Sequence, residues 1–556
     1  MLKSKPIRER NDLIRLAGKH VPLMLLSSLM GMFAGYITVA ILTSVTDAVS
    51  GQTSMTSTLL FEYTALCILV LGCTVVSQLI ASHIGLKLVA DVRENLSRKI
   101  LLAPIDRLER YRKHRLIPVL TEDIGVVSDA FFVIAETLVS IAVITGCAAY
   151  LFYLSPELFG ILLVALIIGV TIQYAAQSRG LKGFLEARNH EDDLHKAYRD
   201  ISDGAKELRI NRVRRWRLYR DGILANVERI RESTTRSMSF YIVGMGLGSA
   251  LFFMMIGVIL AWGDSHPNRA GLVSGFVVML VFLKGPVDQV LSVLPHIGRA
   301  KVAIDRIAEL ARQFNNPESG TMLSDQSPSP VAFESIRMDA VRYEYPSSEQ
   351  GGGFSVGPID LELAGGQIVF LVGDNGSGKT TLIKVLLGLY PPSSGSVLLN
   401  GAPVDESNRD DYRQLFTTVF SDFHLFESVS DGMLADSDDA DHPALAYLKR
   451  LDIDRKVSIK DGTFTTLDLS TGQRKRLALV NAYVEARPVY VFDEWAADQD
   501  PTFRHIFYTE LLPDLRDRGF SVLVISHDDK YFGFADRVIR LENGQVIDKG
   551  KPTSSV

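Results

Sequence analysis

Residues 1 to about 310 alternate long apolar stretches with strongly basic segments. A helix that crosses a bilayer needs roughly 20 consecutive, mostly apolar residues. Six stretches of the chain approach or exceed that length: residues 21–45, 59–84, 130–154, 157–174, 240–262 and 270–294. The pattern therefore predicts a transmembrane domain of six α-helices within residues 1–312.

The segments between these stretches differ sharply in charge. The N-terminal segment and the loops 86–129 and 175–239 are dense in Arg and Lys, whereas the three short connections contain a single Arg. Basic loops face the cytoplasm, so both termini are expected there. Apolar residues at helical spacing in 88–111 also predict that the membrane helices continue beyond the bilayer.

Charged residues inside predicted spans mark candidate substrate contacts. A charge at the centre of a span costs about 2.5–3.5 kcal/mol on insertion scales. Glu136 lies in the third span, and Lys284 and Asp288 lie one helical turn apart in the sixth. The latter two either contact a zwitterionic or anionic substrate in a polar cavity or neutralise each other along one helix face. A structural role is the alternative for Glu136.

A different pattern follows the sixth apolar stretch. Residues 313–330 are polar and rich in Pro, Ser and Asn, which is typical of a linker. Beyond them, short apolar runs suited to strands are followed by helical patterns, which predicts a soluble α/β domain over residues 331–556.

The segment "LVGDNGSGKTT" at 371–381 fits the phosphate-binding template G-x-x-x-x-G-K-[ST]. An apolar strand precedes it and a helix follows, so backbone N–H groups and the helix N-terminus would point at the phosphates. We expect Lys379 to meet the β- and γ-phosphates and the Thr380 hydroxyl to bind Mg²⁺. The remaining expected nucleotide contacts are Gly373, Asn375, Gly376, Ser377, Gly378 and Thr381.

The segment "VYVFDEWAADQDP" at 489–501 drives an apolar strand into two adjacent carboxylates. Buried carboxylates are costly unless a cation or a proton meets them. We expect Asp493 to face Mg²⁺ and Glu494 to orient and deprotonate the attacking water. These residues and the phosphate loop predict an ATPase.

Composition adds little to this picture. The formal charge is −5, and the basic run 209–220 is explained by the positive-inside rule, so no nucleic-acid partner is expected. The three cysteines lie in apolar runs without metal-ligand spacing, which argues against a disulfide framework.

The chain resembles the ABC transporter superfamily over nearly its full length, because "LSTGQ" at 469–473 matches the signature motif of these ATPases. The resemblance implies an exporter (type IV) fold: six transmembrane helices fused to a P-loop nucleotide-binding domain that uses ATP and Mg²⁺. It also implies site residues. Ser470, Gly472 and Gln473 would act on the nucleotide of a facing domain, His527 would be the switch histidine, Tyr345 would stack on adenine, and Asp500 would end the D-loop.

Two departures from the family pattern are visible. Ser421 stands where the family has a Gln that links Mg²⁺ to the membrane domain, and the usual "SALD" D-loop reads "ADQD" at 497–500. The resemblance assigns Asp498 no role. In the family a facing domain completes each ATP site, and this chain has one ATPase domain and no internal repeat. The resemblance therefore implies a homodimer or pairing with a different partner half.

The motifs "VFSDFHLF", "DEWAADQDP" and "ISHDDKYF" resemble those of bacterial exporters of cyclic and siderophore-type peptides. That resemblance implies a peptide substrate and a location in the bacterial inner membrane, with lipid around the helices. A lipid or lipid-linked flippase on the same fold is one alternative. A non-transporting ABC regulator is another.

Overall fold

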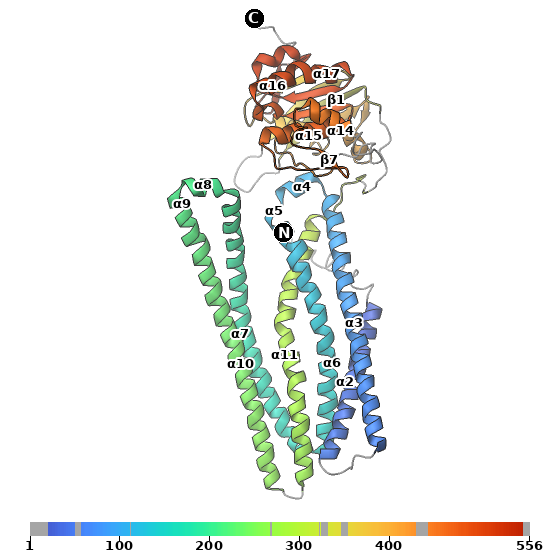
Figure 1. Ribbon diagram of the computed structural model, residues 1–556, viewed down its shortest axis with the longest axis vertical. Helices are drawn as coiled ribbons and strands as arrows, with labels where there is room; N and C mark the ends of the chain where they lie inside the picture. Colours follow the sequence, from blue (N-terminus) through green and yellow to red (C-terminus); the bar gives the residue numbers. More distant parts are fainter. Residues whose placement is uncertain are drawn as a thin grey trace. The chain divides into compact units, whose positions relative to one another are not determined.

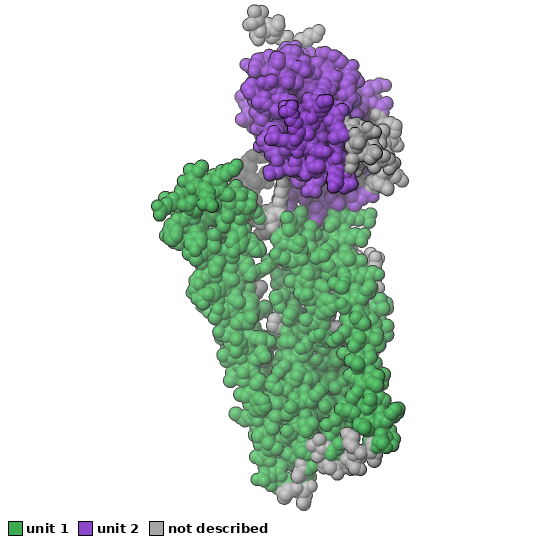
Figure 2. Space-filling view, in the orientation of Figure 1, with its two compact units in different colours: residues 1–98, 112–313 green, residues 99–111, 314–556 purple. Residues whose placement is uncertain are grey.

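The computed structural model describes residues 21–49, 57–111, 113–266, 269–321, 323, 332–345, 354–429 and 443–548. The chain divides into two compact units, drawn in separate colours in Figure 2. The first unit holds residues 1–98 and 112–313, and the second holds residues 99–111 and 314–556. The basic start of the N-terminal segment and residues 324–330 of the predicted linker lie outside the described residues.

The first unit contains long, mostly apolar helices, as Figure 1 shows. Six helices are long and apolar enough to cross a membrane, which confirms the predicted six-helix domain. They are α2 (Val21–Val49), α3 (Ser57–Leu101), α6 (Ile124–Leu154), α7 (Pro156–Asp203), α10 (Ala225–Asp264) and α11 (Ala270–Gln313). Short helical segments lie between some of them: α5 (Lys113–Pro118), η1 (Val119–Asp123), α8 (Ala205–Ile210), α9 (Arg212–Arg217) and η2 (Leu218–Leu224).

Several of these helices continue far past their apolar stretches. Helix α7 has 48 residues, which at 1.5 Å per residue is about 72 Å. The hydrocarbon core of a bilayer is only about 30 Å thick. The polar second half of α7 therefore extends well beyond any single crossing of the membrane.

Small residues allow the helices of the first unit to approach closely. An added Cβ on Gly35 of α2 would lie 3.0 Å from the Ala142 Cβ of α6, and one on Gly244 of α10 would lie 2.7 Å from the Ala176 Cβ of α7. Helices α7 and α10 run side by side (Figure 1). Close backbone approach of this kind is the usual basis of helix packing in membranes.

The second unit is built on a six-stranded sheet in the order β12-β11-β3-β10-β9-β6, parallel except for β12. The strands β3, β9 and β10 are fully buried, which explains why their sequences are apolar except for Asp493 at the end of β9 and Ser521 at the start of β10. The strands are β3 (Ile368–Val372), β6 (Phe416–Val419), β9 (Val489–Asp493), β10 (Ser521–Ile525), β11 (Arg537–Glu542) and β12 (Gln545–Asp548).

A second, antiparallel sheet has the order β2-β1-β4-β5, and β7 pairs with β8. These strands are β1 (Ser335–Glu344), β2 (Ser355–Ala364), β4 (Ser394–Leu399), β5 (Ala402–Pro403), β7 (Ile459–Lys460) and β8 (Thr463–Phe464). The helices are α4 (Ile105–Arg110), α12 (Lys379–Leu386), α13 (Arg409–Arg413), α14 (Pro443–Arg450), α15 (Thr471–Glu485), α16 (Pro501–Ile506) and α17 (Leu512–Asp517). The α/β prediction for this half is confirmed.

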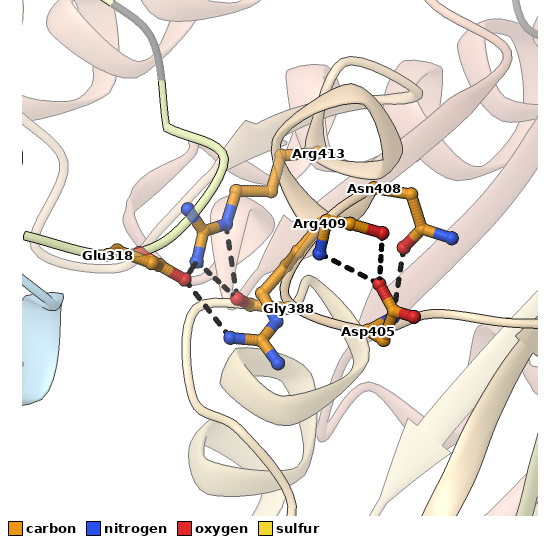
Figure 3. Close-up of polar contacts among 7 residues, drawn as sticks. Glu318, Gly388, Asp405, Asn408, Arg409 and Arg413 are labelled. Carbon is orange, nitrogen blue, oxygen red and sulfur yellow. Dashed lines mark hydrogen bonds and ion pairs between the residues drawn. The ribbon is translucent and has the colours of Figure 1, made fainter.

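The chain that follows α11 is built into the second unit. Phe314 is buried and meets the Tyr111 ring edge-on, and the Glu318 backbone N–H donates to the Leu102 carbonyl at 2.8 Å. The Glu318 carboxylate accepts from Arg409 at 3.3 Å and from Arg413 (Figure 3). All three charged side chains are less than one-fifth exposed, so this start of the predicted linker has a fixed place.

Glu318→Gln is expected to destabilise the protein, because it leaves two largely buried guanidinium groups without their shared carboxylate. Such a loss costs about 2–3 kcal/mol, which corresponds to a fall in Tm of about 4–12 °C for a unit of this size. Differential scanning fluorimetry of the full chain in detergent measures the shift. The exposed pair Arg342–Glu344 supplies the control Glu344→Gln, for which we expect no shift. Equal Tm values for both variants would contradict the interpretation.

Candidate active site

The predicted site residues follow adjacent strands of the six-stranded sheet. The phosphate loop follows β3, His527 follows β10, Asp493 and Glu494 end β9, and Ser421 follows β6. Strands β3, β10, β9 and β6 are neighbours and parallel. Their carboxyl ends therefore share one edge, which is where ligands bind in open α/β sheets.

Two glycines of the phosphate loop hold conformations that a side chain would block. Gly373 has φ +151 and Gly378 has φ +105. An added Cβ would lie 2.1 Å from the Leu541 carbonyl oxygen at Gly373 and 2.7 Å from Val356 Cγ2 at Gly378. The loop can therefore turn tightly at both ends and lead directly into α12, whose N-terminus is the part of a helix that suits an anion.

Lys379 is the first residue of α12, and its side chain reaches back into this loop. Its side chain is buried, and Nζ donates to the carbonyl oxygens of Gly373 at 2.7 Å and Asp374 at 3.0 Å. Burial lowers its pKa, against the opposing charges of Glu494, Asp493 and Asp374. The buried Ser377 Oγ has no hydrogen-bond partner within the described residues. A buried cation and an unsatisfied hydroxyl in one loop fit a bound phosphate.

Asp493 is a buried carboxylate and thus complements the buried ammonium group of Lys379. It is 2% exposed at the end of β9. Burial raises its pKa, Glu494 raises it further, and the hydrogen bond that Ser421 Oγ donates at 3.3 Å lowers it. A divalent cation would relieve this unfavourable burial. Ser421 is placed to reach the same cation by its hydroxyl, and the exposed Thr380 at the start of α12 is the third predicted ligand.

Glu494 and His527 face one another. Glu494 Oε1 lies 3.4 Å from His527 Nε2, and both side chains are more than one-third exposed. The Glu494 backbone is left-handed, with φ 52 and ψ 33, and its N–H donates to the Ile525 carbonyl at 3.2 Å. The Glu494 carboxylate therefore lies, partly exposed, at the carboxyl end of the parallel strands, where it can contact a water.

Hydrogen bonds hold Ser526 and Asp528, the two residues that flank His527. Tyr508 Oη lies 2.6 Å from Ser526 Oγ and donates to Asp528 Oδ2 at 3.0 Å. The Asp528 N–H in turn donates to Ser526 Oγ. Both neighbours of His527 in the chain are therefore anchored.

Tyr345 lies beside the phosphate loop. Its Oη is 3.1 Å from Thr381 Oγ1, and its ring meets Tyr343 and Tyr390 edge-on. Stacking on adenine stays a prediction. Asn375 and Gly376 are exposed at the rim of the loop.

The signature residues lie at the N-terminus of α15. Ser470 caps this helix, and Gln473 completes a capping box by accepting from the Ser470 N–H. An added Cβ on Gly472 would lie 2.9 Å from the Asp498 carbonyl oxygen, so this turn needs glycine. In the part of the chain that the structure describes, these residues form hydrogen bonds within their own turn, with Lys456 and with the D-loop. Action on a facing domain's nucleotide stays a prediction.

Asp500 lies at the end of the D-loop and caps α16, accepting from the Phe503 N–H at 2.9 Å. This hydrogen bond is the main reason why its pKa is lowered. It also pairs with Arg476 of α15 at 2.6 Å. The D-loop and the signature helix are thus joined.

Sequence reasoning missed two sets of residues at this site. Lys475 of α15 is 2% exposed and contacts both the Glu494 carbonyl and Asp498. The available signal was its spacing of four residues from buried Leu479 on the same helix face. The second set involves Glu109 of α4, which accepts from Lys384 Nζ of α12 at 2.9 Å and from Tyr390 Oη.

These features define a membrane-embedded ATPase of the exporter type. The family models for the ABC transporter transmembrane region and the ABC transporter match residues 21–206 and 356–497. The chain is 33% identical to the ATP-binding protein SyrD of Pseudomonas syringae pv. syringae, over 98% of this chain and 97% of that protein. It therefore belongs to the ABC transporter family.

Two further comparisons agree with this assignment. An ATP-dependent lipid A-core flippase of Bordetella avium is 26% identical over 86% of this chain and 82% of its own. The solved structure of a bacterial Atm1-family ABC exporter with ATP bound has the same fold, with a TM-score of 0.72 at 17% identity over 96% and 95% of the two chains. The protein is an ATP-driven ABC exporter, and its half-transporter architecture implies a dimer.

Proposed function

We propose that a homodimer of this chain exports a cyclic or siderophore-type peptide from the cytoplasm across the bacterial inner membrane. The resemblance of its motifs to peptide exporters supports the substrate class. The observation that carries the proposal is a cavity of the first unit between α7, α10 and α11.

The walls of this cavity are mainly apolar and include one pair of oppositely charged residues. Its lining includes Phe252 and Met255 and also the Lys284–Asp288 pair, whose Nζ and Oδ2 lie 2.6 Å apart. The two sequence hypotheses for this pair are therefore compatible, because the residues neutralise each other and also face the cavity. Apolar surface with both signs of charge suits an amphipathic peptide better than a strongly anionic ligand.

Glu136 is placed differently from that pair. It lies on α6 and accepts a hydrogen bond from Gln289 Nε2 of α11 at 2.9 Å. It is not among the residues that line the cavity. This bond between two helices supports the structural role that the sequence left open.

For hydrolysis, we assign nucleotide binding to the phosphate loop and the base to Glu494. Lys379 and the loop N–H groups would bind the β- and γ-phosphates, and Thr380, Asp493 and Ser421 would hold Mg²⁺. The ion would supply charge neutralisation at the phosphates when bound. Glu494 would take the proton of the attacking water, and His527 would orient the carboxylate and the γ-phosphate.

A contact within the second unit supports coupling of hydrolysis to transport. Glu109 belongs to the segment that follows α3, yet it pairs with Lys384 on the helix that begins at the phosphate loop. Any shift of α12 on nucleotide binding would move α4 and hence α3. We therefore assign this coupling role to the loop between α3 and α6.

A lipid flippase is the second candidate, because relatives named ATP-dependent lipid A-core flippase match most of this chain. The two functions are distinguished by measuring which compounds stimulate the ATPase activity of the reconstituted wild-type protein. We expect cyclic or siderophore-precursor peptides to raise the basal rate and lipid A-core lipid to leave it unchanged. Stimulation by the lipid alone would replace the proposal with the flippase.

Lys284→Gln is expected to abolish most peptide stimulation while basal hydrolysis persists, since it removes one charge of the cavity wall. Arg269→Gln, which breaks an exposed ion pair with Glu157 at the end of the helices, is the matched control and should retain stimulation. Peptide stimulation that is equal in both variants would contradict the assignment of this cavity.

A further inference from the structure

We propose that Lys475 and Asp498 are positioning residues, which hold the backbone of Glu494 so that its carboxylate faces the reacting water. This inference rests on the proposed role of Glu494 as the general base. It also gives Asp498, which the family resemblance left without a role, a defined function.

The Lys475 ammonium has two partners. Nζ donates to the Glu494 carbonyl oxygen at 2.8 Å and lies 2.7 Å from Asp498 Oδ2. The lysine side chain is 3% exposed, whereas that of Asp498 is 49% exposed. An ammonium buried to this degree is costly unless it is paired and hydrogen-bonded. Lys475 is therefore held strongly in the one position that satisfies it.

A second hydrogen bond joins the same two segments, α15 and residues 494–495. Here the side chain belongs to residues 494–495 and the backbone carbonyl to α15. Trp495 is fully buried, stacks on Phe507 at 4.4 Å between ring centroids, and donates from Nε1 to the Lys475 carbonyl at 2.9 Å. The side chain of each segment thus bonds to the backbone of the other. This reciprocal arrangement leaves little freedom for residues 494 and 495 to move relative to α15.

Glu494 needs such support because its backbone is left-handed, with φ 52 and ψ 33. A residue other than glycine rarely adopts this conformation, because its Cβ comes too close to the following carbonyl oxygen. The Ile525 carbonyl accepts from its N–H at 3.2 Å, and Lys475 donates to its carbonyl. Both backbone polar groups are therefore held, which aims the side chain at His527, 3.4 Å away.

Without Lys475 the carbonyl of Glu494 would lose its shorter hydrogen bond, at 2.8 Å, and keep only the one from the Ala497 N–H at 3.3 Å. The residue would then be less firmly held and could relax toward an ordinary conformation. The carboxylate would then swing away from the water, while the phosphate loop, which lies on another strand, would stay intact. The expected kinetic result is a fall in turnover with little change in apparent affinity for ATP. A general loss of structure would instead reduce both.

The test is a double-mutant cycle on the full chain, with ATPase kcat and KM as readouts. We expect Lys475→Met to lower kcat about 10–100-fold with KM within about twofold of wild type. Asp498→Asn, on a half-exposed side chain, should lower kcat about 3–10-fold and provides a second variant if Lys475→Met fails to fold. Arg450→Gln, whose partner Asp514 lies in α17, is the matched control and should keep wild-type kinetics.

The Glu494→Gln background distinguishes positioning from a structural role. If Lys475 acts through Glu494, adding Lys475→Met to Glu494→Gln changes the residual rate less than about twofold. The same fold-loss in both backgrounds, or a parallel rise in KM, would overturn the proposal. Wild-type turnover in Glu494→Gln alone would instead refute the proposed base, so the two failures are distinguishable.

Discussion

Glu494→Gln is expected to lower ATPase turnover by about 10²–10⁴-fold, because an amide cannot accept the proton of the attacking water. ATP binding should persist, since the phosphate loop lies on β3 and Glu494 follows β9. The side chain keeps its size and its neighbour His527 at 3.4 Å. Phosphate release measures turnover, and equilibrium nucleotide binding measures the affinity for ATP. The two expectations are thus tested separately.

Glu542→Gln, on the partly exposed end of β11, is the matched control for the loss of one carboxylate. It should retain wild-type turnover. If Glu494→Gln retained more than about one-tenth of wild-type turnover, the base would have to be sought elsewhere at this sheet edge, whatever the control showed.

Lys379→Ala is expected to weaken ATP binding by about 10–150-fold. The reason is the loss of charge-assisted hydrogen bonds to phosphate oxygens, each of which contributes about 1.5–3 kcal/mol. The lysine is already buried within the loop, bonded to the Gly373 and Asp374 carbonyls. Little reorganisation is needed for it to meet a phosphate. The dissociation constant of ATP, measured by titration calorimetry in detergent, reports the change.

Lys460→Ala, on the short strand β7, removes one positive charge far from the phosphate loop in sequence and serves as the control. Its ATP affinity should stay within about twofold of wild type. If Lys379→Ala bound ATP as tightly as Lys460→Ala, the phosphate-binding assignment of the loop would be wrong.

The fold was predictable because its signals are local and periodic. Apolar stretches of membrane-spanning length indicated the helices of the first unit. The buried strands β3 and β9 were visible as apolar runs that lead into the phosphate loop and into Asp493 and Glu494, and β10 leads in the same way to Ser526 and His527. The convergence of Lys379, Asp493 and His527 follows once those strands lie in one parallel sheet, because their carboxyl ends must share an edge.

What escaped prediction depends on contacts between distant segments. The spacing of Lys475 from Leu479 places both residues on one face of α15, but the sequence does not show that Lys475 is buried against residues 494–498. Glu109 pairs with Lys384, 275 residues later in the chain, and no periodicity connects them. The Lys284–Asp288 pair could be foreseen because residues four apart meet on a helix. The bond from Gln289 to Glu136 could not.

ATP-dependent uptake of peptides into inverted inner-membrane vesicles shows directly whether the chain exports peptides. Vesicles with wild-type protein and vesicles with Glu494→Gln would be compared on cyclic and siderophore-precursor peptides. We expect uptake that needs ATP, occurs with the wild type and disappears in the variant. Wild-type vesicles that hydrolyse ATP but take up none of these peptides would contradict it.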